Sequence, residues 1–180
     1  HRTDYIENNY WDIEKSEMLN SFSALGRTTA EMTEYCPNTY EGWDFGNIWA
    51  EDMYGVNDGY PVLQCQLPKN IPTAPVLTDT LINDLQITLT WINPSTDRTG
   101  LILTDLTAIH ITRNGEFVKT IESPIIGASE SFTDSVAEPG CYNYRIYGVN
   151  SAGSGLLSKT SHILGQMFSG GTGTESDPYL

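Results

Sequence analysis

Large apolar side chains alternate with polar ones between residues 85 and 91, and this alternation constrains the fold more than any other feature of the chain. The apolar positions are Leu85, Ile87, Leu89 and Trp91, separated by glutamine and threonines. A period of two places all four side chains on one face of a β-strand. We therefore predict a strand with one face in a core and the other face in solvent.

The same period returns downstream, with turn residues between the alternating segments. Residues 108–112 alternate, and Asn114-Gly115 then supply the two positive-φ positions of a type I′ turn before a strand at 117–121. Residues 142–146 alternate again, and a last strand is expected near 156–163. Because short strands follow one another without a helical period, we predict an antiparallel β-sandwich in this part of the chain.

Proline and glycine mark the boundaries between the parts of the chain. Residues 67–75 contain three prolines, which fix φ and remove backbone donors, so we predict a semi-rigid linker. Before the linker, residues 1–66 hold 11 of the 19 aromatic residues and form an aromatic-rich unit. After the sandwich, residues 165–180 are rich in glycine and are typical of a flexible segment.

Residues of about 72–164 resemble a fibronectin type III domain. The resemblance rests on Trp91 followed by Pro94, on the hairpin Arg113-Asn114-Gly115, and on the run 139–153. It implies a seven-stranded antiparallel β-sandwich. In that family the tyrosine at the position of Tyr142 forms a corner hydrogen bond, and the residues at Trp91 and Ile146 lie in the core. Such domains usually act as spacers or binding modules, and the fold alone specifies no activity.

Four blocks in the first unit resemble the segment that closes the GLUG-motif β-helical repeats of bacterial surface proteins. The blocks are residues 9–14, 26–32, 42–49 and 57–63. These repeats also occur beside IgA-peptidase-like enzymes. Residues 169–180 resemble the opening of another such repeat domain. The resemblance implies a piece of a longer, modular extracellular protein, in which a fibronectin-like spacer stands between two β-helical domains.

The first unit also makes physical sense without the resemblance. Thr28 stands three residues before Glu31, the spacing of a capping box, so we predict a short helix from Thr29 to about Tyr35. Two helical turns are unstable alone, so this helix must dock on other residues. We interpret the tryptophans of this unit as the core of a small cap with one helix.

The aromatic residues of the first unit are also candidates for sugar binding. Exposed rings stack on pyranose rings while neighbouring carboxylates and amides bind the hydroxyl groups. The candidate residues are Tyr10, Trp11, Tyr40 and Trp43. Because large aromatic side chains are usually buried, we favour the interpretation that they form a core.

Oxygen ligands for calcium occur at Asp52, Asn57 and Asp58. The spacing is not that of an EF-hand, and Asn57-Asp58-Gly59 has equally good turn chemistry. We therefore expect no cofactor and keep calcium as the alternative.

Three cysteines leave the pairing of thiols open. Cys36, Cys65 and Cys141 contain no Cys-x-x-Cys spacing, which argues against a zinc site. In a secreted protein, Cys36 and Cys65 could form a disulfide that leaves Cys141 over. The alternative interpretation is three unpaired cysteines that behave as small buried hydrophobes.

Charge and missing motifs narrow the range of functions. The chain has 23 acidic and 9 basic residues, a formal charge of −14, which disfavours nucleic acid and anionic membranes as partners. The sequence lacks the Gly-x-Ser-x-Gly elbow, the His-Glu-x-x-His zinc helix and a phosphate-binding loop with lysine. No run of apolar residues is long enough to span a membrane. We therefore predict no catalytic site in these residues.

These observations favour a non-catalytic module of a secreted or cell-surface bacterial protein, acting in adhesion or as a structural spacer. One alternative is an accessory module that positions a large extracellular peptidase or glycan-degrading enzyme on its substrate. Another is direct glycan binding by the aromatic residues of the first unit. The expected partners are neighbouring domains, host or matrix glycans or proteins, and further copies of the chain paired through exposed strand edges.

Overall fold

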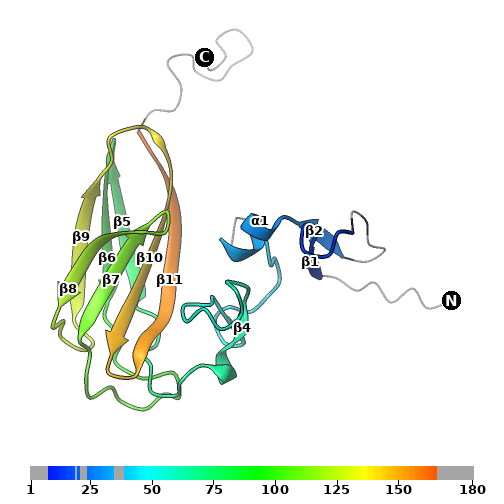
Figure 1. Ribbon diagram of the computed structural model, residues 1–180. Coiled ribbons are helices and arrows are strands. Elements are labelled where there is room, and N and C mark those ends of the chain that lie inside the picture. Colours follow the sequence, from blue (N-terminus) through cyan, green and yellow to red (C-terminus); the bar gives the residue numbers. More distant parts are fainter. Residues whose placement is uncertain (1–7, 19, 21–23, 35–38, 166–180) are drawn as a thin grey trace, which may run out of the picture. The chain divides into compact units, whose positions relative to one another are not determined.

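The chain is organised as two compact units of β-structure. Figure 1 shows the computed structural model, which describes residues 8–18, 20, 24–34 and 39–165. The first unit is His1–Leu67 and the second is Pro68–Leu180. Strands dominate the described residues, so the predicted mainly β fold is confirmed. Within the described ranges, no helix is long and apolar enough to cross a membrane.

The first unit is built from very short elements. In chain order they are strands β1 (Tyr10–Asp12) and β2 (Leu25–Arg27), helix α1 (Thr29–Thr33), strands β3 (Trp49–Ala50) and β4 (Val62–Leu63), and the 3-10 helix η1 (Gln64–Gln66). β1 pairs with β2 in parallel, and β3 pairs with β4 antiparallel. Ladders of two or three residues satisfy few backbone groups, so side chains must bond much of the remaining backbone.

The predicted capping box at the start of α1 is confirmed. The Glu31 amide donates to the Thr28 hydroxyl at 3.2 Å, and the Thr28 amide donates to the Glu31 carboxylate at 2.8 Å. Met32 is the buried residue of the helix. The helix ends at Thr33, shorter than expected, and Tyr35 lies outside the described residues. One reciprocal cap and one buried side chain hold this single turn against the unit.

The described residues of the second unit form seven strands in two antiparallel sheets (Figure 1). The strands are β5 (Val76–Asn83), β6 (Gln86–Ile92), β7 (Ala108–Arg113), β8 (Glu116–Glu122), β9 (Ser129–Ser135), β10 (Gly140–Asn150) and β11 (Gly153–Leu164). One sheet has the order β11-β10-β7-β8 and the other has the order β5-β6-β9. The two sheets share one apolar core.

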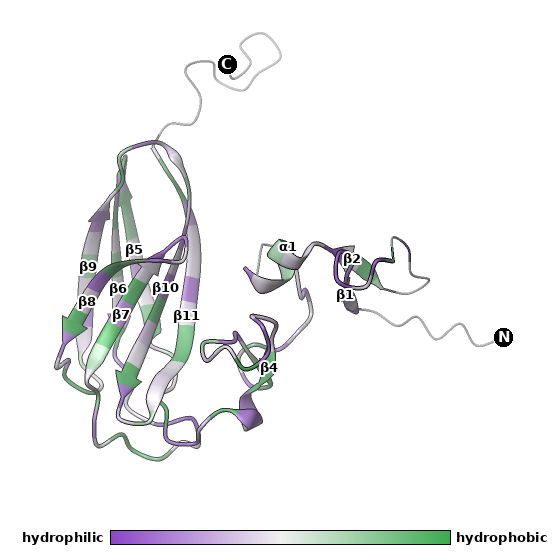
Figure 2. Cartoon of the chain, in the orientation of Figure 1, coloured by the Kyte–Doolittle hydropathy of each residue, from purple (hydrophilic) through white to green (hydrophobic). Residues whose placement is uncertain are grey.

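The core is made by the alternating residues of strands from both sheets. Figure 2 shows hydrophobic colour recurring along the strands of this unit. In β6, Ile87, Leu89 and Trp91 are fully buried while the residues between them are not, so the predicted alternation is confirmed. Ile109 and Ile146 contribute from the opposite sheet and are equally buried. Burial of such side chains contributes about 2 kcal/mol each to folding.

The turn between β7 and β8 has the geometry that its sequence predicts. Asn114 and Gly115 have φ values of 50° and 87°, the positive pair that a type I′ turn requires. β7 then pairs with β8 from Arg113 and Glu116 onward, with one irregularity after Thr112.

The predicted linker at 67–75 is only partly a linker. Ile71, Pro72 and Pro75 are fully buried in the second unit. The Ile71 carbonyl accepts from the Arg98 amide at 2.9 Å, and the Pro72 carbonyl accepts from the Leu156 amide at 2.9 Å. Proline lacks a donor but keeps its carbonyl, so Pro72 can extend the hydrogen bonding at the edge of β11.

Candidate functional site

Aromatic rings in the first unit pack on one another. Trp43 and Trp49 are stacked with ring centroids 4.2 Å apart, and Tyr40 lies 4.9 Å from Trp43. Tyr10 meets Tyr40 edge to face at 5.6 Å. Tyr40 is only 4% exposed. The ring faces that a sugar would need are therefore largely used by neighbouring rings.

The polar tips of these rings are bonded to the backbone. The Trp43 indole donates to the Asn8 carbonyl at 2.8 Å, and the Tyr40 hydroxyl donates to the Met32 carbonyl at 3.1 Å. Trp11 lies in a different place, against Gly26 of β2, where a Cβ would come within 2.7 Å of the indole nitrogen. Three of the four candidate sugar-binding residues thus come together as a packed cluster, and sugar binding there stays a prediction.

A polar cross-link that the sequence did not suggest joins the two ends of the first unit. The Tyr60 hydroxyl donates to the carboxylate of Asp12, although 48 positions separate them. Asp12 also accepts from the amides of Glu14 and Lys15, each at 2.8 Å. Partial burial raises the pKa of Asp12, but the donors outweigh it and lower the pKa to about 2. No local signal identifies such a distant pair.

Asp52 organises the loop that was the candidate calcium site. Its carboxylate accepts from the amides of Val56, Asn57 and Gly59 at 2.9, 2.7 and 3.1 Å. Burial opposes ionisation, but these donors hold the pKa of Asp52 below its usual value. The Asn57 side chain donates to the Pro61 carbonyl at 2.9 Å, and Asp58 has a φ of 51°.

Two of the three candidate calcium ligands, Asp52 and Asn57, therefore already have partners within the loop. Across the described ranges, no group of three or more His, Cys, Asp or Glu side chains is arranged to hold a metal ion. Calcium binding at Asp52, Asn57 and Asp58 stays a prediction, and an ion there would have to displace several backbone donors from Asp52.

The cysteines lie at exposed positions where the structure describes them. Cys65 and Cys141 are both exposed, so they are not the small buried hydrophobes of the alternative interpretation. Cys36 lies outside the described residues, and its pairing with Cys65 stays a prediction.

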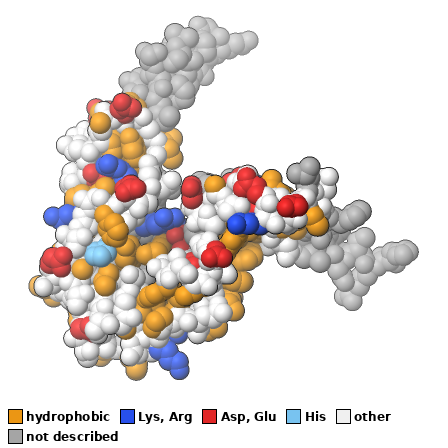
Figure 3. Space-filling view, viewed as in Figure 1, with side chains coloured by type: hydrophobic (Ala, Val, Ile, Leu, Met, Phe, Trp, Pro, Cys, Tyr) orange, Lys and Arg blue, Asp and Glu red, His pale blue; other side chains and the backbone are white. Residues whose placement is uncertain are grey.

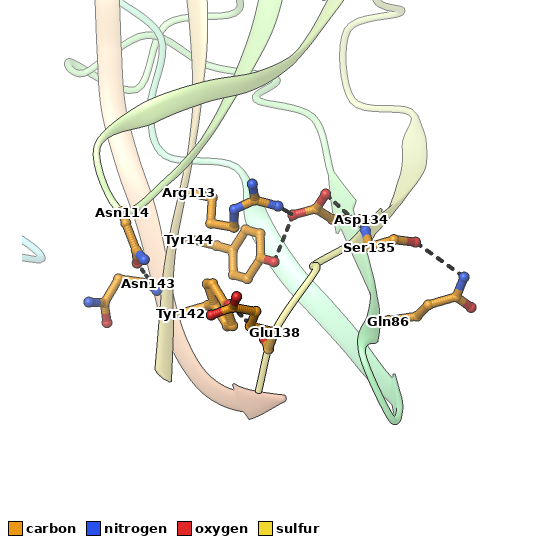
Figure 4. Close-up of polar contacts among 9 residues, drawn as sticks. All are labelled: Gln86, Arg113, Asn114, Asp134, Ser135, Glu138, Tyr142, Asn143 and Tyr144. Atoms are coloured by element: carbon orange, nitrogen blue, oxygen red, sulfur yellow. Dashed lines mark hydrogen bonds and ion pairs between the residues drawn. The ribbon is translucent and has the colours of Figure 1, made fainter. Parts of the chain in front are cut away.

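A partly buried ionic network links the two sheets of the second unit (Figure 4). Arg113 of β7 and Asp134 of β9 form an ion pair with an Nη1 to Oδ2 distance of 2.6 Å. The Tyr144 hydroxyl of β10 donates to the same oxygen at 2.8 Å. β7 and β10 belong to the four-stranded sheet and β9 belongs to the other sheet. This inter-sheet clamp therefore holds the layers together through a charged contact as well as through apolar packing.

Burial and charge shift the titration of the clamp. Burial raises the pKa of Tyr144, and its bond to the Asp134 carboxylate raises it further. Burial lowers the pKa of Arg113, but Asp134 outweighs that effect and raises it. A sequence signal for the clamp existed: Asp134 stands between Phe132 and Val136 in period two, which places an acid on a core-facing row.

The residues that the family resemblance assigned to the core and the corner have definite places. Trp91 and Ile146 are fully buried. The Tyr142 hydroxyl donates to the Glu138 carbonyl at 2.8 Å, and the Arg113 guanidinium lies 5.8 Å from the centre of the Tyr142 ring. The Trp91 indole donates to the Asn93 side chain at 2.8 Å. The Trp91 contact stabilises the core of the second unit, and the Tyr142 contacts stabilise the end of the unit where β10 begins.

The chain enters and leaves the second unit at opposite ends. The Asn150 side chain donates to the Asn70 carbonyl at 2.8 Å, which fixes the incoming chain beside one end of β10. Leu164, the last residue of β11, pairs with Gly140 at the other end of β10. β10 has 11 residues, so the two points are about 33 Å apart along the strand.

Charged side chains are dispersed over the face of the chain that Figure 3 shows. On the face shown in Figure 3, the basic side chains stand singly among acidic and hydrophobic ones. The ion pair between Arg113 and Asp134, at 2.6 Å, is much closer than the one between Arg27 and Glu31, at 4.0 Å.

Comparisons with known proteins add little to this geometry. No family model and no curated protein matches the chain. A match to the spore cortex lytic enzyme SleM of Clostridium perfringens has 14% identity and a TM-score of 0.37, and it covers 53% of this chain and 28% of that one. A match to a beta-1,2-glucanase of Parabacteroides distasonis has 20% identity and a TM-score of 0.35, and it covers 56% and 14%.

A third match is to the twitchin kinase region of C. elegans (Fn31-NL-kin-CRD-Ig26), with 19% identity and a TM-score of 0.35. It covers 61% of this chain and 20% of that one. The chain thus spans less than a third of the length of each of these structures. Similarity at this level assigns neither a fold nor an activity to the chain.

Proposed function

We propose that this chain is a non-catalytic module of a secreted or cell-surface bacterial protein, and that its second unit spaces and orients neighbouring domains in adhesion. The observation that carries the proposal is the placement of the two points where the chain enters and leaves that unit. They lie at opposite ends of β10, about 33 Å apart. A domain threaded in this way separates whatever precedes it from whatever follows it.

The family resemblance of residues 72–164 supports the proposal. We infer a fibronectin type III-like domain, because three strands face four around a core that contains Trp91 and Ile146. The hydroxyl of Tyr142 forms a bond to a carbonyl four residues earlier, as the resemblance implies for that position. For the first unit we infer the closing segment of a GLUG-type repeat region, on the four sequence blocks alone.

The hydrogen bonds between the incoming segment and β11 suit a module that bears mechanical tension. The Pro72 carbonyl accepts from the Leu156 amide, and the Pro75 carbonyl accepts from the Ser158 hydroxyl. Both partners advance along the chain together, so the incoming segment runs parallel to β11. Tension applied at residue 70 and at residue 165 therefore shears these bonds together and does not open them one at a time.

Single-molecule force spectroscopy tests this function directly. The full chain is tethered at both ends and the unfolding force of the second unit is measured for the wild type and for Ser158→Ala. We expect Ser158→Ala to lower the unfolding force, because it removes one of the sheared contacts. Ser161→Ala is the matched control, since the Ser161 hydroxyl bonds to Asn143 inside the β10–β11 hairpin.

Two results would argue against the spacer function. One is an unfolding force for the wild type near the noise level, and the other is an equal loss of force in both serine variants. Antibody labelling of intact source cells tests the surface location separately. Labelling only after the cells are made permeable would exclude a surface module, whatever the mechanical result.

A further inference from the structure

The outer strands of the two sheets in the second unit differ in how their open edges are protected. An open edge presents unpaired backbone groups, and charged side chains normally discourage a second strand from pairing there. The charged residues are Glu116, Lys119 and Glu122 on β8, Glu130 and Asp134 on β9, Lys159 on β11, and Asp79 on β5. β11 already bonds to Pro72 along its first half. β5 is therefore an open edge with a single charged side chain, and that carboxylate accepts from the Thr80 amide at 2.8 Å.

β5 also leaves aliphatic side chains in solvent. Val76 is 59% exposed, Leu81 is 65% exposed and Ile82 is 42% exposed. Ile82 pairs with the fully buried Ile87, so it belongs to the core-facing row of the sheet. A core-facing residue that is nearly half exposed shows that the core is incompletely covered beside this edge.

The regular part of β5 is short and symmetric about one residue. The register with β6 shifts between Leu77 and Asp79, which marks an irregularity in the ladder. At the other end, Asn83 pairs with Gln86 across a two-residue turn. The uninterrupted ladder therefore runs from 79 to 83, and Leu81 is its central residue.

The alternation of hydrogen bonds shows which backbone groups face the open edge. The pair that closes a two-residue hairpin is hydrogen-bonded, and every second pair after it repeats that arrangement. Asn83, Leu81 and Asp79 therefore bond toward β6. The amide and carbonyl groups of Thr80 and Ile82 point away from β6, and in the part of the chain that the structure describes β6 is the strand with which β5 pairs.

We propose that β5 is a self-association site at which β5 of a second copy adds in antiparallel orientation, with Leu81 of both copies at the two-fold axis. Thr80 then lies opposite Ile82 of the other copy, and each pair exchanges backbone hydrogen bonds after the Thr80 amide has left the Asp79 carboxylate. Asp79 lies opposite Asn83, so no like charges face each other. This self-complementarity is what an isologous two-fold contact needs. The site is independent of the spacer function.

The size of the contact sets the expected strength of association. Five paired residues extend about 17 Å, well below a standard interface. Self-association should therefore be weak in dilute solution and strengthen where many copies are displayed close together.

Analytical ultracentrifugation of the full chain, in reducing buffer and over a range of concentrations, tests the proposal. The wild type is expected to form dimers at high concentration. Leu81→Lys and Leu81→Asp each place like charges at the axis, so each should weaken dimerisation by more than about tenfold. An equimolar mixture of the two variants should dimerise again, because opposite charges then meet at the axis.

Val76→Lys is the matched control for added charge. Val76 is on the same strand and, like Leu81, is an exposed aliphatic residue, but it lies outside the ladder from 79 to 83. We expect Val76→Lys to dimerise as the wild type does, and circular dichroism confirms that each variant is folded. A wild type that stays monomeric at every concentration overturns the proposal. So does a mixture of the two Leu81 variants that fails to dimerise.

Discussion

Replacing Asp134 by asparagine measures how strongly the clamp ties the two sheets together. Asparagine keeps the shape of the side chain and one oxygen for the Tyr144 hydroxyl, but it removes the negative charge that faces Arg113. A charged hydrogen bond contributes about 1.5 to 3 kcal/mol. The Arg113 side chain is 29% exposed, so solvent screens part of this contribution. We expect Asp134→Asn to lower the free energy of unfolding by about 1.5 kcal/mol.

Asp134→Ala should cost more, because it removes the acceptor for Tyr144 as well as the charge. Adding about 1 kcal/mol for that hydrogen bond, and a smaller loss of packing, gives about 3 kcal/mol. Tyr144→Phe removes the hydroxyl alone and should cost about 1 kcal/mol. The order of the three variants is therefore a stricter test than any one value.

Urea unfolding of the full chain gives these values, and amide hydrogen exchange in peptides from β7, β9 and β10 assigns the loss to the second unit. Glu116→Gln removes an exposed carboxylate from β8 and should stay within about 0.5 kcal/mol of the wild type. The reasoning is refuted if Asp134→Asn is as stable as Glu116→Gln, or if exchange in β9 is unchanged in Asp134→Ala.

Three further predictions concern single side chains. Tyr60→Phe removes a donor to Asp12, so the pKa of Asp12 should rise from about 2 toward 3.8 in a carboxyl titration by NMR, and an unchanged titration would contradict the cross-link. Asp52→Ala should speed amide exchange at Val56, Asn57 and Gly59 by more than about tenfold, since their acceptor is lost; unchanged exchange would show that other contacts hold the loop. Gly115→Ala should destabilise the second unit by about 1 kcal/mol in urea unfolding, because φ is 87° there, and a neutral result would argue against the type I′ turn.

The second unit could be predicted from the sequence because its information is local and periodic. The alternation through Trp91 and the turn at Asn114-Gly115 depend on residues next to one another, and both have the expected geometry. The burial of Ile71, Pro72 and Pro75 does not follow from the composition of residues 67–75, because a proline-rich segment has the composition of a linker whether or not it packs. The number of prolines predicts how many backbone amide donors are missing, but it does not predict whether the proline carbonyls accept hydrogen bonds.

The polar contacts were harder to predict because they join residues that are distant in the sequence. Tyr60 and Asp12 are 48 positions apart, and Arg113 and Asp134 are 21 apart. Neither pair produces a sequence pattern that can be recognised within a short segment of the chain. Asp134 was nevertheless visible as an acid on a core-facing row, and an acid in such a position requires a cationic or donor partner. A search for core-facing charges would have identified the clamp, although not its partners.

Four of the 23 acidic residues have a structural role that composition alone does not suggest. Asp12, Asp44, Asp52 and Asp97 each accept from two or more backbone amides close in the sequence. Three of them lie in the first unit, whose strands are too short to satisfy their backbone through ladders. In that unit, aspartate carboxylates thus accept backbone hydrogen bonds that a neighbouring strand would otherwise accept. The pKa of each of the four aspartates is lowered as a result.

An aspartate whose pKa is lowered in the folded state contributes stability above its unfolded pKa near 4, and that stability is lost as pH falls through the folded pKa. The first unit therefore depends on its ionised aspartates for its loops, so its high negative charge is not by itself a sign of a cationic ligand.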